Sequence, residues 1–486
     1  MRIGQTSAIQ FISKIVTSAG GFLATLYFAR IVGSDTLGIY FILLSSVGWL
    51  SVLVDAGISP AITKRMSEGE APAEYFQLGL GVIGVGTGAI TVFLLLFSKQ
   101  VTDYVTHPYS TYFLIILVIS GIAMTAVRTG LSGTRNVHIS GILTSIQSII
   151  RIVLQVAAVS IGLGLSGLVF GWVLSSLAVA AVGFVYLAVK AENYPSLNQI
   201  NARERLMGIY SFAKYSWLGS LKSKTNNYAD ILILGLFVPS NLIGVYAIAW
   251  NIASFLTILG SAIETTLFPE FSQLENQDDY TEITDLLQKS LQYTGLFVIP
   301  GLFGGILLGD RILRLYGSDF VVGFEVLILL IVSVLIYDYQ KQLTGVLQGI
   351  DRPDIDFRVN GTFIGSNIIL NFILIQQIGW HGAAIATVLS SSISLAYAYY
   401  AVSEILPVSV PVREIGRQIG ASIIMAISVV LLEAIESTYT ITDHNAAVLF
   451  GLVFAGATIY MVTLMIISDD TRKTIFDNLP ISYLDR

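Results

Sequence analysis

The chain has 486 residues, of which 54% are hydrophobic and only 12% are charged, with a formal net charge of −6. A soluble domain carries about 25% charged residues, so this composition cannot cover a globular surface in water. It excludes a secreted protein, a nucleic-acid-binding protein and a cytosolic enzyme, and it indicates a polytopic membrane protein.

Apolar segments long enough to cross a bilayer as helices recur along the whole chain. The first is expected to stay as a membrane span instead of being cleaved as a leader, because Lys14 interrupts its apolar run. We predict an all-α fold with about fourteen transmembrane helices separated by short loops rich in Gly and Pro. In chain order the predicted spans are Ala8–Val32, Leu37–Ile62, Phe76–Phe97, Tyr112–Gly133, Ile139–Ile161, Gly164–Val189, Ile209–Phe237, Leu242–Phe268, Ser290–Leu308, Phe324–Leu347, Val359–Ile378, Gly382–Ser403, Ile415–Leu432 and Ala446–Ile467.

Lysine and arginine are unequally distributed between the two sides of these spans. If the N-terminus is cytoplasmic, most cations outside the spans fall at inner ends, and only Arg30, Lys99, Arg311 and Arg314 fall at outer ends. Because cytoplasmic loops carry the excess of Lys and Arg, we predict a multi-pass protein of the cell membrane with both termini in the cytoplasm.

The sequence repeats itself weakly, with a period of about 210 residues. Gly38 and Tyr40 match Gly244 and Tyr246 at an offset of 206 residues, and a Val-Leu-Ser-Ser motif at 173–176 recurs at 388–391. A repeat of six spans gives two parallel lobes, with the substrate site of a transporter expected in a cavity between them. The predicted domains are an N-lobe at 1–190, a cytoplasmic linker at 191–208, a C-lobe at 209–404, two further helices at 405–468 and a cytoplasmic tail at 469–486.

Charged side chains inside the spans are the candidate functional residues, since an intramembrane charge is costly and usually faces a cavity or a partner. The excess of cations over acids predicts a positive cavity that suits an anionic, phosphate-bearing substrate. The predicted phosphate-binding residues are Lys14, Arg151, Lys222, Lys224, Lys214, Arg128 and Lys341. The predicted ion-coupling residues or charge partners are Asp55, Asp230 and Asp338.

Two alternatives to phosphate binding stay open for these cations. Arg128, Lys341, Lys14 and Lys214 are near enough to span ends to extend toward the lipid headgroups. Lys222, Lys224 and Arg151 lie deeper and could form structural ion pairs, with Asp230 as one candidate partner.

Motifs for other chemistry are missing from the sequence. The chain has no cysteine, and it contains no P-loop, no Gly-x-Ser-x-Gly elbow and no His-Glu-x-x-His metal motif. No cofactor and no metal are therefore expected, and a transporter is favoured over an enzyme.

Several segments resemble a known family. The stretches Leu26–Gly33, Leu37–Tyr40 and Asp55–Ile58 resemble the opening of the Wzx-like, polysaccharide-synthesis-type flippases. The stretches Asp230–Gly235 and Ile243–Ala249 resemble the start of the second lobe in that family, which belongs to the multidrug/oligosaccharidyl-lipid/polysaccharide exporter superfamily.

This resemblance implies a flippase that moves a polyprenyl- or dolichyl-phosphate-linked oligosaccharide from the cytoplasmic to the outer leaflet by alternating access. The acidic loops indicate a high-salt habitat, and in a haloarchaeon such a protein would serve N-glycosylation of the surface-layer protein. The implied partners are the lipid-linked oligosaccharide and membrane lipid, with a functional link to glycosyltransferases and an oligosaccharyltransferase. No nucleic acid is expected, and the protein is expected to be a monomer.

Two other functions remain open. A multidrug or cation antiporter of the same superfamily would be expected to carry a carboxylate in the first span, where this chain has Lys14. A membrane glycan polymerase or ligase typically needs a large outer loop, and the predicted outer loops are no longer than Ser98–Thr111 or Gly309–Gly323.

Overall fold

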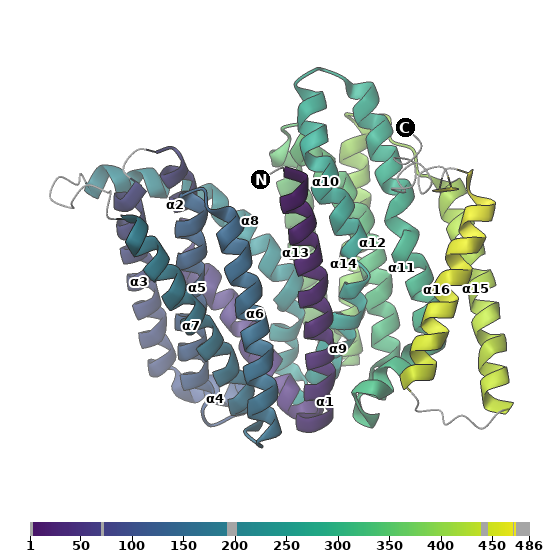
Figure 1. Cartoon of the computed structure of the whole chain (residues 1–486), viewed down its shortest axis with the longest axis horizontal. Coiled ribbons are helices and arrows are strands. Elements are labelled where there is room, and N and C mark those ends of the chain that lie inside the picture. The colour runs from purple at the N-terminus through teal and green to yellow at the C-terminus, as the bar shows by residue number, and fades with distance from the viewer. Residues whose placement is uncertain (1–2, 70–71, 192–201, 439–445, 470, 473–486) are drawn as a thin grey trace. The chain divides into compact units, whose positions relative to one another are not determined.

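The computed structural model describes residues 3–69, 72–191, 202–438, 446–469 and 471–472, and within these ranges it leaves out the side chains of 3–19, 191, 215, 218–224 and 226–227. Nearly all of the described residues are helical, and no strand occurs among them (Figure 1). The predicted fold class, an all-α polytopic membrane protein, is confirmed.

Contacts along the chain divide it into two compact units, Met1–Gly244 and Val245–Arg486. The first unit contains α1 (Ile3–Asp55), α2 (Ile58–Ser67), α3 (Pro72–Leu96), α4 (Ser98–Val105), α5 (Ser110–Gly133), α6 (Val137–Ser160), α7 (Gly164–Ala191), α8 (Ala202–Phe237) and the start of α9 (Ser240–Phe255). The second unit contains the rest of α9, α10 (Ile258–Glu275), α11 (Tyr280–Tyr316), the 3₁₀ helix η2 (Ser318–Gly323), α12 (Phe324–Gly349), α13 (Pro353–Ile378), α14 (His381–Ser403), α15 (Val412–Thr438) and α16 (Ala446–Ile467). The predicted lobes, linker and tail are drawn from the sequence repeat and not from contacts, so these boundaries stay a prediction.

Every predicted span falls on one or two of these helices. Within the described residues, 11 helices are long and apolar enough to cross a membrane, or up to 12 if α9 and α10, which meet at a bend of 50°, form one span. The 11 include Gly20–Asp55 of α1 as a single helix, whereas the sequence predicts two spans in α1. Within the described part of α8, Tyr228–Phe237 forms a shorter apolar segment. A multi-pass membrane protein is confirmed, and the count of fourteen spans stays a prediction.

The predicted junction between the first two spans is a sharp break inside α1. Gly33 has φ 76° and ψ 174°, which is not a helical conformation. A residue with a side chain rarely adopts a positive φ of this size, so the glycine allows the chain to change direction without a loop.

The two repeat-related junctions contact each other inside the first unit. A Cβ atom on Gly38 would lie 1.7 Å from the carbonyl oxygen of Ser240, and one on Gly244 would lie 2.0 Å from the carbonyl oxygen of Ser34. The Ser240 hydroxyl also donates a hydrogen bond to the Asp35 carboxylate. Because 34 and 38 are each 206 residues before 240 and 244, the contact is reciprocal: each copy of the motif presents a serine carbonyl to the glycine of the other.

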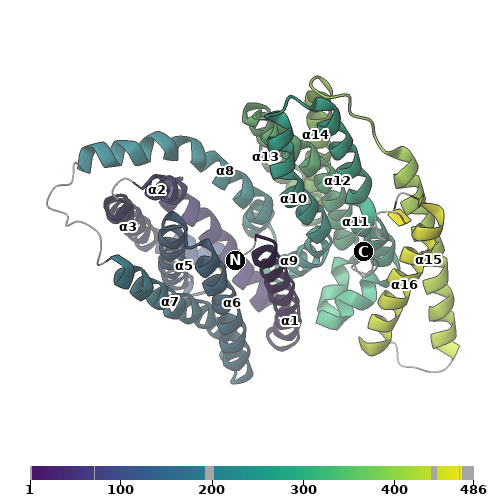
Figure 2. The same cartoon turned by 45° about the horizontal axis from the view of Figure 1, so that its top comes forward.

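Corresponding helix pairs in the two units are joined by amide-to-serine hydrogen bonds. In the first unit, the Gln147 amide of α6 donates to the Ser176 hydroxyl of α7 at 3.1 Å. In the second unit, the Asn367 amide of α13 donates to the Ser390 hydroxyl of α14 at 3.5 Å. Both serines belong to the repeated Val-Leu-Ser-Ser motif, and in each unit the two helices pack side by side (Figure 2). Each copy of the motif thus accepts an amide hydrogen bond from the helix that precedes it, although the paired positions are not the same in the two units.

The last two helices attach to the second unit through α11. Arg311 of α11 pairs with Glu433 at 3.4 Å and with Glu436 at 2.8 Å, both on α15. The Gln418 amide of α15 donates to the backbone carbonyl of Gln292 at 2.7 Å. α16 packs along α15 (Figure 1). Polar contacts at both ends of α15 thus hold this pair to the rest of the unit.

We expect Gly38→Ala and Gly244→Ala to destabilise the protein, because the added methyl group collides with backbone and not with a movable side chain. Overpacking of this kind costs about 1–3 kcal/mol, which would lower the thermal unfolding midpoint in detergent. Gly141→Ala in α6 is the control, since no atom lies within 4 Å of the added Cβ there. If all three variants unfold at the same temperature, the close contact at the junctions does not exist.

Candidate functional site

Arg151 lies at the centre of a polar face of α6 inside the first unit. Its guanidinium carbon is 4.4 Å from the centre of the Trp172 ring of α7. One turn further along α6, the buried Gln155 amide donates to the Tyr40 hydroxyl at 2.8 Å and to the backbone carbonyl of Leu168 at 2.7 Å. A cation over an aromatic face is stabilised where water is scarce, so this arrangement holds a positive charge within an apolar bundle.

The same guanidinium also faces α1 and α8. Arg151 interacts electrostatically with the hydroxyl groups of Tyr40 and Tyr228. The Tyr228 ring packs against α1 at Gly48, where an added Cβ would lie 2.7 Å from the ring. Tyr228 belongs to α8, the helix that also carries Lys222, Lys224 and Asp230.

Of the remaining predicted cations of the first unit, the structure describes the side chains of two, Arg128 and Lys214. Arg128 of α5 is exposed and donates to the Thr125 hydroxyl at 3.3 Å, and Lys214 of α8 is exposed. The side chains of Lys14, Lys222 and Lys224 lie outside the described residues, although α1 and α8 contain their backbone. A phosphate-binding role for all of these stays a prediction.

The two predicted acids of the first unit occupy different positions. Asp55, at the end of α1, accepts hydrogen bonds from the backbone N–H of Ser59 at 3.0 Å and from the Ser59 hydroxyl. It thereby satisfies a donor in the first turn of α2, as a helix-capping residue does. Asp230 is half-buried in α8. Asp55 therefore has a structural role at the start of α2 in addition to its predicted role in ion coupling.

In the second unit, the structure brings Lys341 and Asp338 together on the face of α12 that packs against α10. Lys341 Nζ is 2.9 Å from the Glu264 carboxylate and donates to the Ser261 hydroxyl at 2.8 Å. Asp338 is fully buried, and neither of its carboxylate oxygens has a hydrogen-bond partner among the described residues. It lies directly against Gly260, where an added Cβ would be 2.7 Å from a carboxylate oxygen.

Sequence reasoning missed the side chains that surround Arg151 and Lys341. Gln147 and Gln155 flank Arg151 at intervals of four residues, and this spacing was a usable signal, because positions four apart share one face of a helix. Glu264 is separated from Lys341 by more than 70 residues of sequence, and nothing local to either residue indicates that they pair. Among the described residues, no group of three or more His, Asp or Glu side chains could hold a metal ion.

Comparison with known proteins finds one matching family and two similar proteins from one organism. The sequence pattern of the polysaccharide biosynthesis protein family matches residues 27–322. A probable flippase, AglR, of Haloferax volcanii is 32% identical over 483 residues, which cover 98% of each chain. A probable low-salt glycan biosynthesis flippase, Agl15, of the same organism is 26% identical over 481 residues and 99% of each chain.

Two solved structures share the fold at lower sequence identity. The lipid II flippase MurJ in its inward closed conformation matches with a TM-score of 0.79 and 18% identity, over 95% of this chain and 99% of that one. An inward-facing multidrug resistance transporter of the MATE family and MOP superfamily matches with a TM-score of 0.64 and 14% identity, over 80% of this chain and 95% of that one.

The fold therefore defines a polytopic membrane protein whose architecture is shared with the flippase MurJ and with a transporter of the MATE family. The chain belongs to the polysaccharide biosynthesis protein family. This confirms the resemblance found in the sequence and favours a transporter over a membrane-bound polymerase or ligase.

We expect the ion pair between Lys341 and Glu264 to contribute measurably to stability, because both side chains are largely removed from water. Glu264→Gln leaves the ammonium group without its partner and should cost about 1–3 kcal/mol. The double variant Glu264→Gln with Lys341→Met should recover most of that loss. A double-mutant cycle on thermal unfolding in detergent measures the coupling, and strictly additive effects would contradict it.

Proposed function

We propose that the protein is a flippase that moves a lipid-linked oligosaccharide from the cytoplasmic to the outer leaflet for surface glycan or N-glycoprotein assembly. Family membership and the two Haloferax relatives, both named as probable flippases, support the class of reaction. The observation that carries the proposal is Arg151, an arginine held over Trp172 inside an apolar bundle.

The chemistry of the substrate explains the need for such a residue. A polyprenyl or dolichyl phosphate carries negative charge at the point where sugar and lipid meet, and that charge must cross the bilayer with the sugar. Arginine binds phosphate with two parallel N–H groups, and these charge-assisted bonds are about twice as strong as neutral ones. We assign Arg151, with Lys14, Lys214, Lys222, Lys224, Arg128 and Lys341, to phosphate binding. We assign Asp55, Asp230 and Asp338 to ion coupling or charge compensation.

The junction contact supplies a place at which alternating access can be tested. In our proposal the two repeat-related junctions, 34–38 and 240–244, are together in one state of the cycle and separate in the other. The hydrogen bond between Asp35 and Ser240 is the polar part of this contact, and the two glycines are its close-packed part. Because the contact between the junctions is small, it can form in one state and break in the other with little rearrangement of the helices on either side.

The cellular setting follows from the charge distribution and the relatives. We propose a cell-membrane protein with both termini in the cytoplasm, acting as a monomer. Its substrate would come from membrane-associated glycosyltransferases and would be consumed by an oligosaccharyltransferase, as in assembly of a surface-layer glycoprotein. The lobes at 1–190 and 209–404, the linker between them and the two added helices are the proposed moving parts.

We expect Arg151→Ala combined with Lys222→Ala to abolish glycan delivery while the protein level stays normal. Each lost charge-assisted hydrogen bond is worth about 1.5–3 kcal/mol, so transport should fall more than ten-fold. The measurement is the glycan on a surface glycoprotein in cells lacking the native gene, together with the lipid-linked glycan that accumulates. Arg413→Ala, which removes an exposed cation at the start of α15, is the matched control, and unchanged glycosylation in the double variant would refute the site assignment.

We expect a disulfide between positions 35 and 240 to stop transport reversibly. The chain has no cysteine, so Asp35→Cys with Ser240→Cys introduces the only thiols. Oxidation should join the junctions and block glycan delivery, and reduction should restore it, while each single cysteine variant stays active under both conditions. Full transport by the cross-linked protein would show that these junctions do not separate during the cycle.

A further inference from the structure

The first turns of α8 are docked on α2 and α3 by arginine side chains. Arg65 of α2 donates from Nε to the backbone carbonyl of Gly208 at 3.2 Å and from Nη2 to the Ser211 hydroxyl at 3.3 Å. Arg205 of α8 pairs with Glu74 of α3 at 3.2 Å and lies over the Tyr75 ring at 5.0 Å. These contacts fix a segment that precedes the apolar part of α8 and that the charge distribution assigns to the cytoplasmic surface.

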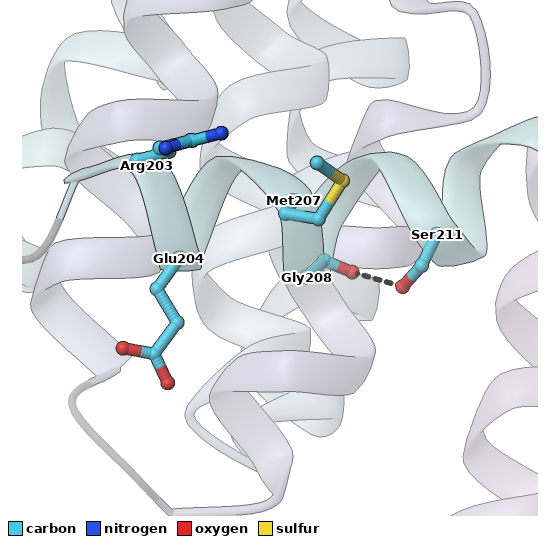
Figure 3. A pocket seen from close by; sticks show the side chains of 5 residues that line it. All are labelled: Arg203, Glu204, Met207, Gly208 and Ser211. Atoms are coloured by element: carbon cyan, nitrogen blue, oxygen red, sulfur yellow. Dashed lines mark hydrogen bonds between the residues drawn. The ribbon is translucent and has the colours of Figure 1, made fainter.

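A hollow of about 490 Å³ is formed on this docked segment. Its lining residues are Arg203, Glu204, Met207, Gly208 and Ser211. Figure 3 shows Arg203 and Met207 on one side of the helix and Glu204 on the other, with the Ser211 hydroxyl bonded to the Gly208 carbonyl at 2.9 Å. The lining thus holds one cation, Arg203, and one acid, Glu204, whereas the neighbouring Arg65 is already paired with Glu68 at 3.0 Å.

Large apolar side chains are exposed beside these cations. Met207 is 59% exposed and Tyr210 is 65% exposed. Exposed apolar and aromatic groups next to arginines are typical of a helix that lies in the interface of a membrane, where the rings and thioethers contact acyl chains and the cations contact headgroups. The segment therefore combines the two kinds of contact that one phospholipid molecule offers.

We propose that this hollow binds the phosphate headgroup of an anionic membrane phospholipid. Arg203 would hold the phosphate, the Ser211 hydroxyl would contact the headgroup, and Met207 and the neighbouring Tyr210 would contact the chains. The volume is within the range of small-ligand sites and suits a phosphate with its glycerol. The proposal rests on the membrane orientation given above, but it does not depend on the identity of the transported substrate.

General attraction between basic loops and an anionic surface must be separated from this specific site. Each Lys or Arg near such a surface contributes about 1 kcal/mol, wherever it lies along the loops. Arg358 of α13 is the control, because it is exposed, is predicted to face the cytoplasm and does not line the hollow. If the hollow is a specific site, loss of Arg203 must weaken phospholipid binding more than loss of Arg358.

The test counts lipids bound to the purified full-length protein by native mass spectrometry, in titrations with phosphatidylglycerol or phosphatidylcholine. We expect Arg203→Gln to bind the first phosphatidylglycerol about five-fold more weakly, the change that corresponds to one surface cation. Met207→Gln should also weaken this binding, whereas Arg358→Gln should leave it unchanged, and phosphatidylcholine should not distinguish the variants.

Two results would overturn the proposal. Equal losses in Arg203→Gln and Arg358→Gln would mean general electrostatic attraction only. Displacement of phosphatidylglycerol by an equimolar polyprenyl phosphate, sensitive to Arg203→Gln, would assign the hollow to the transported lipid instead. Because no transport is measured, failure of the flippase proposal would leave this outcome unaffected, and normal glycan delivery by Arg203→Gln would separate the two sites in cells.

Discussion

A charged side chain inside an apolar helix needs an oppositely charged partner, an aromatic face or water, because hydrocarbon does not solvate charge. This constraint explains the polar clusters of both units. Arg151 lies over Trp172, and Lys341 pairs with Glu264. Asp55 accepts donors from the start of α2. Asp338 is the exception, since it is buried beside Gly260 without a hydrogen bond to its carboxylate among the described residues, and this makes it the acid most in need of a proton or cation.

The duplicated sequence explains how the first unit is closed around its junctions. Two copies of one motif can meet along a local two-fold relation, and then a residue that fits in one copy also fits in the other. The serine and glycine at 34 and 38 meet those at 240 and 244 in this way. In both copies the close contact is possible because the glycine has no Cβ atom. The Ser-Ser motifs of α7 and α14 repeat the principle with hydrogen bonds to α6 and α13.

Helices and their breaks were largely readable from the sequence, whereas side-chain partners were not. Apolar length is a local property, so each predicted span falls on a helix, and Gly33 marks the break in α1 because only glycine tolerates its backbone angles. α11 begins at Tyr280, ten residues before the predicted span, since a helix continues beyond the membrane when its polar residues can be solvated. The pairing of Glu264 with Lys341 depends on how α10 packs against α12, which no local pattern encodes. The polar face of α6 was predictable in part. The spacing of its polar residues is evident in the sequence, whereas their partners on α1 and α7 are not.

The structure also ranks the candidate phosphate-binding cations. Lys341 already has a carboxylate partner, so binding a phosphate there would require that ion pair to break or a second anion to be accommodated beside the first. Arg151 is held differently. A guanidinium over an aromatic face is stabilised through its plane, while its five N–H donors point outward along the edge of that plane. Phosphate oxygens approach along the same edge, so the contact with Trp172 orients Arg151 without competing with an anion. By this reasoning the cation–π contact prepares Arg151 for a transient phosphate, whereas Lys341 can bind a phosphate only in competition with Glu264.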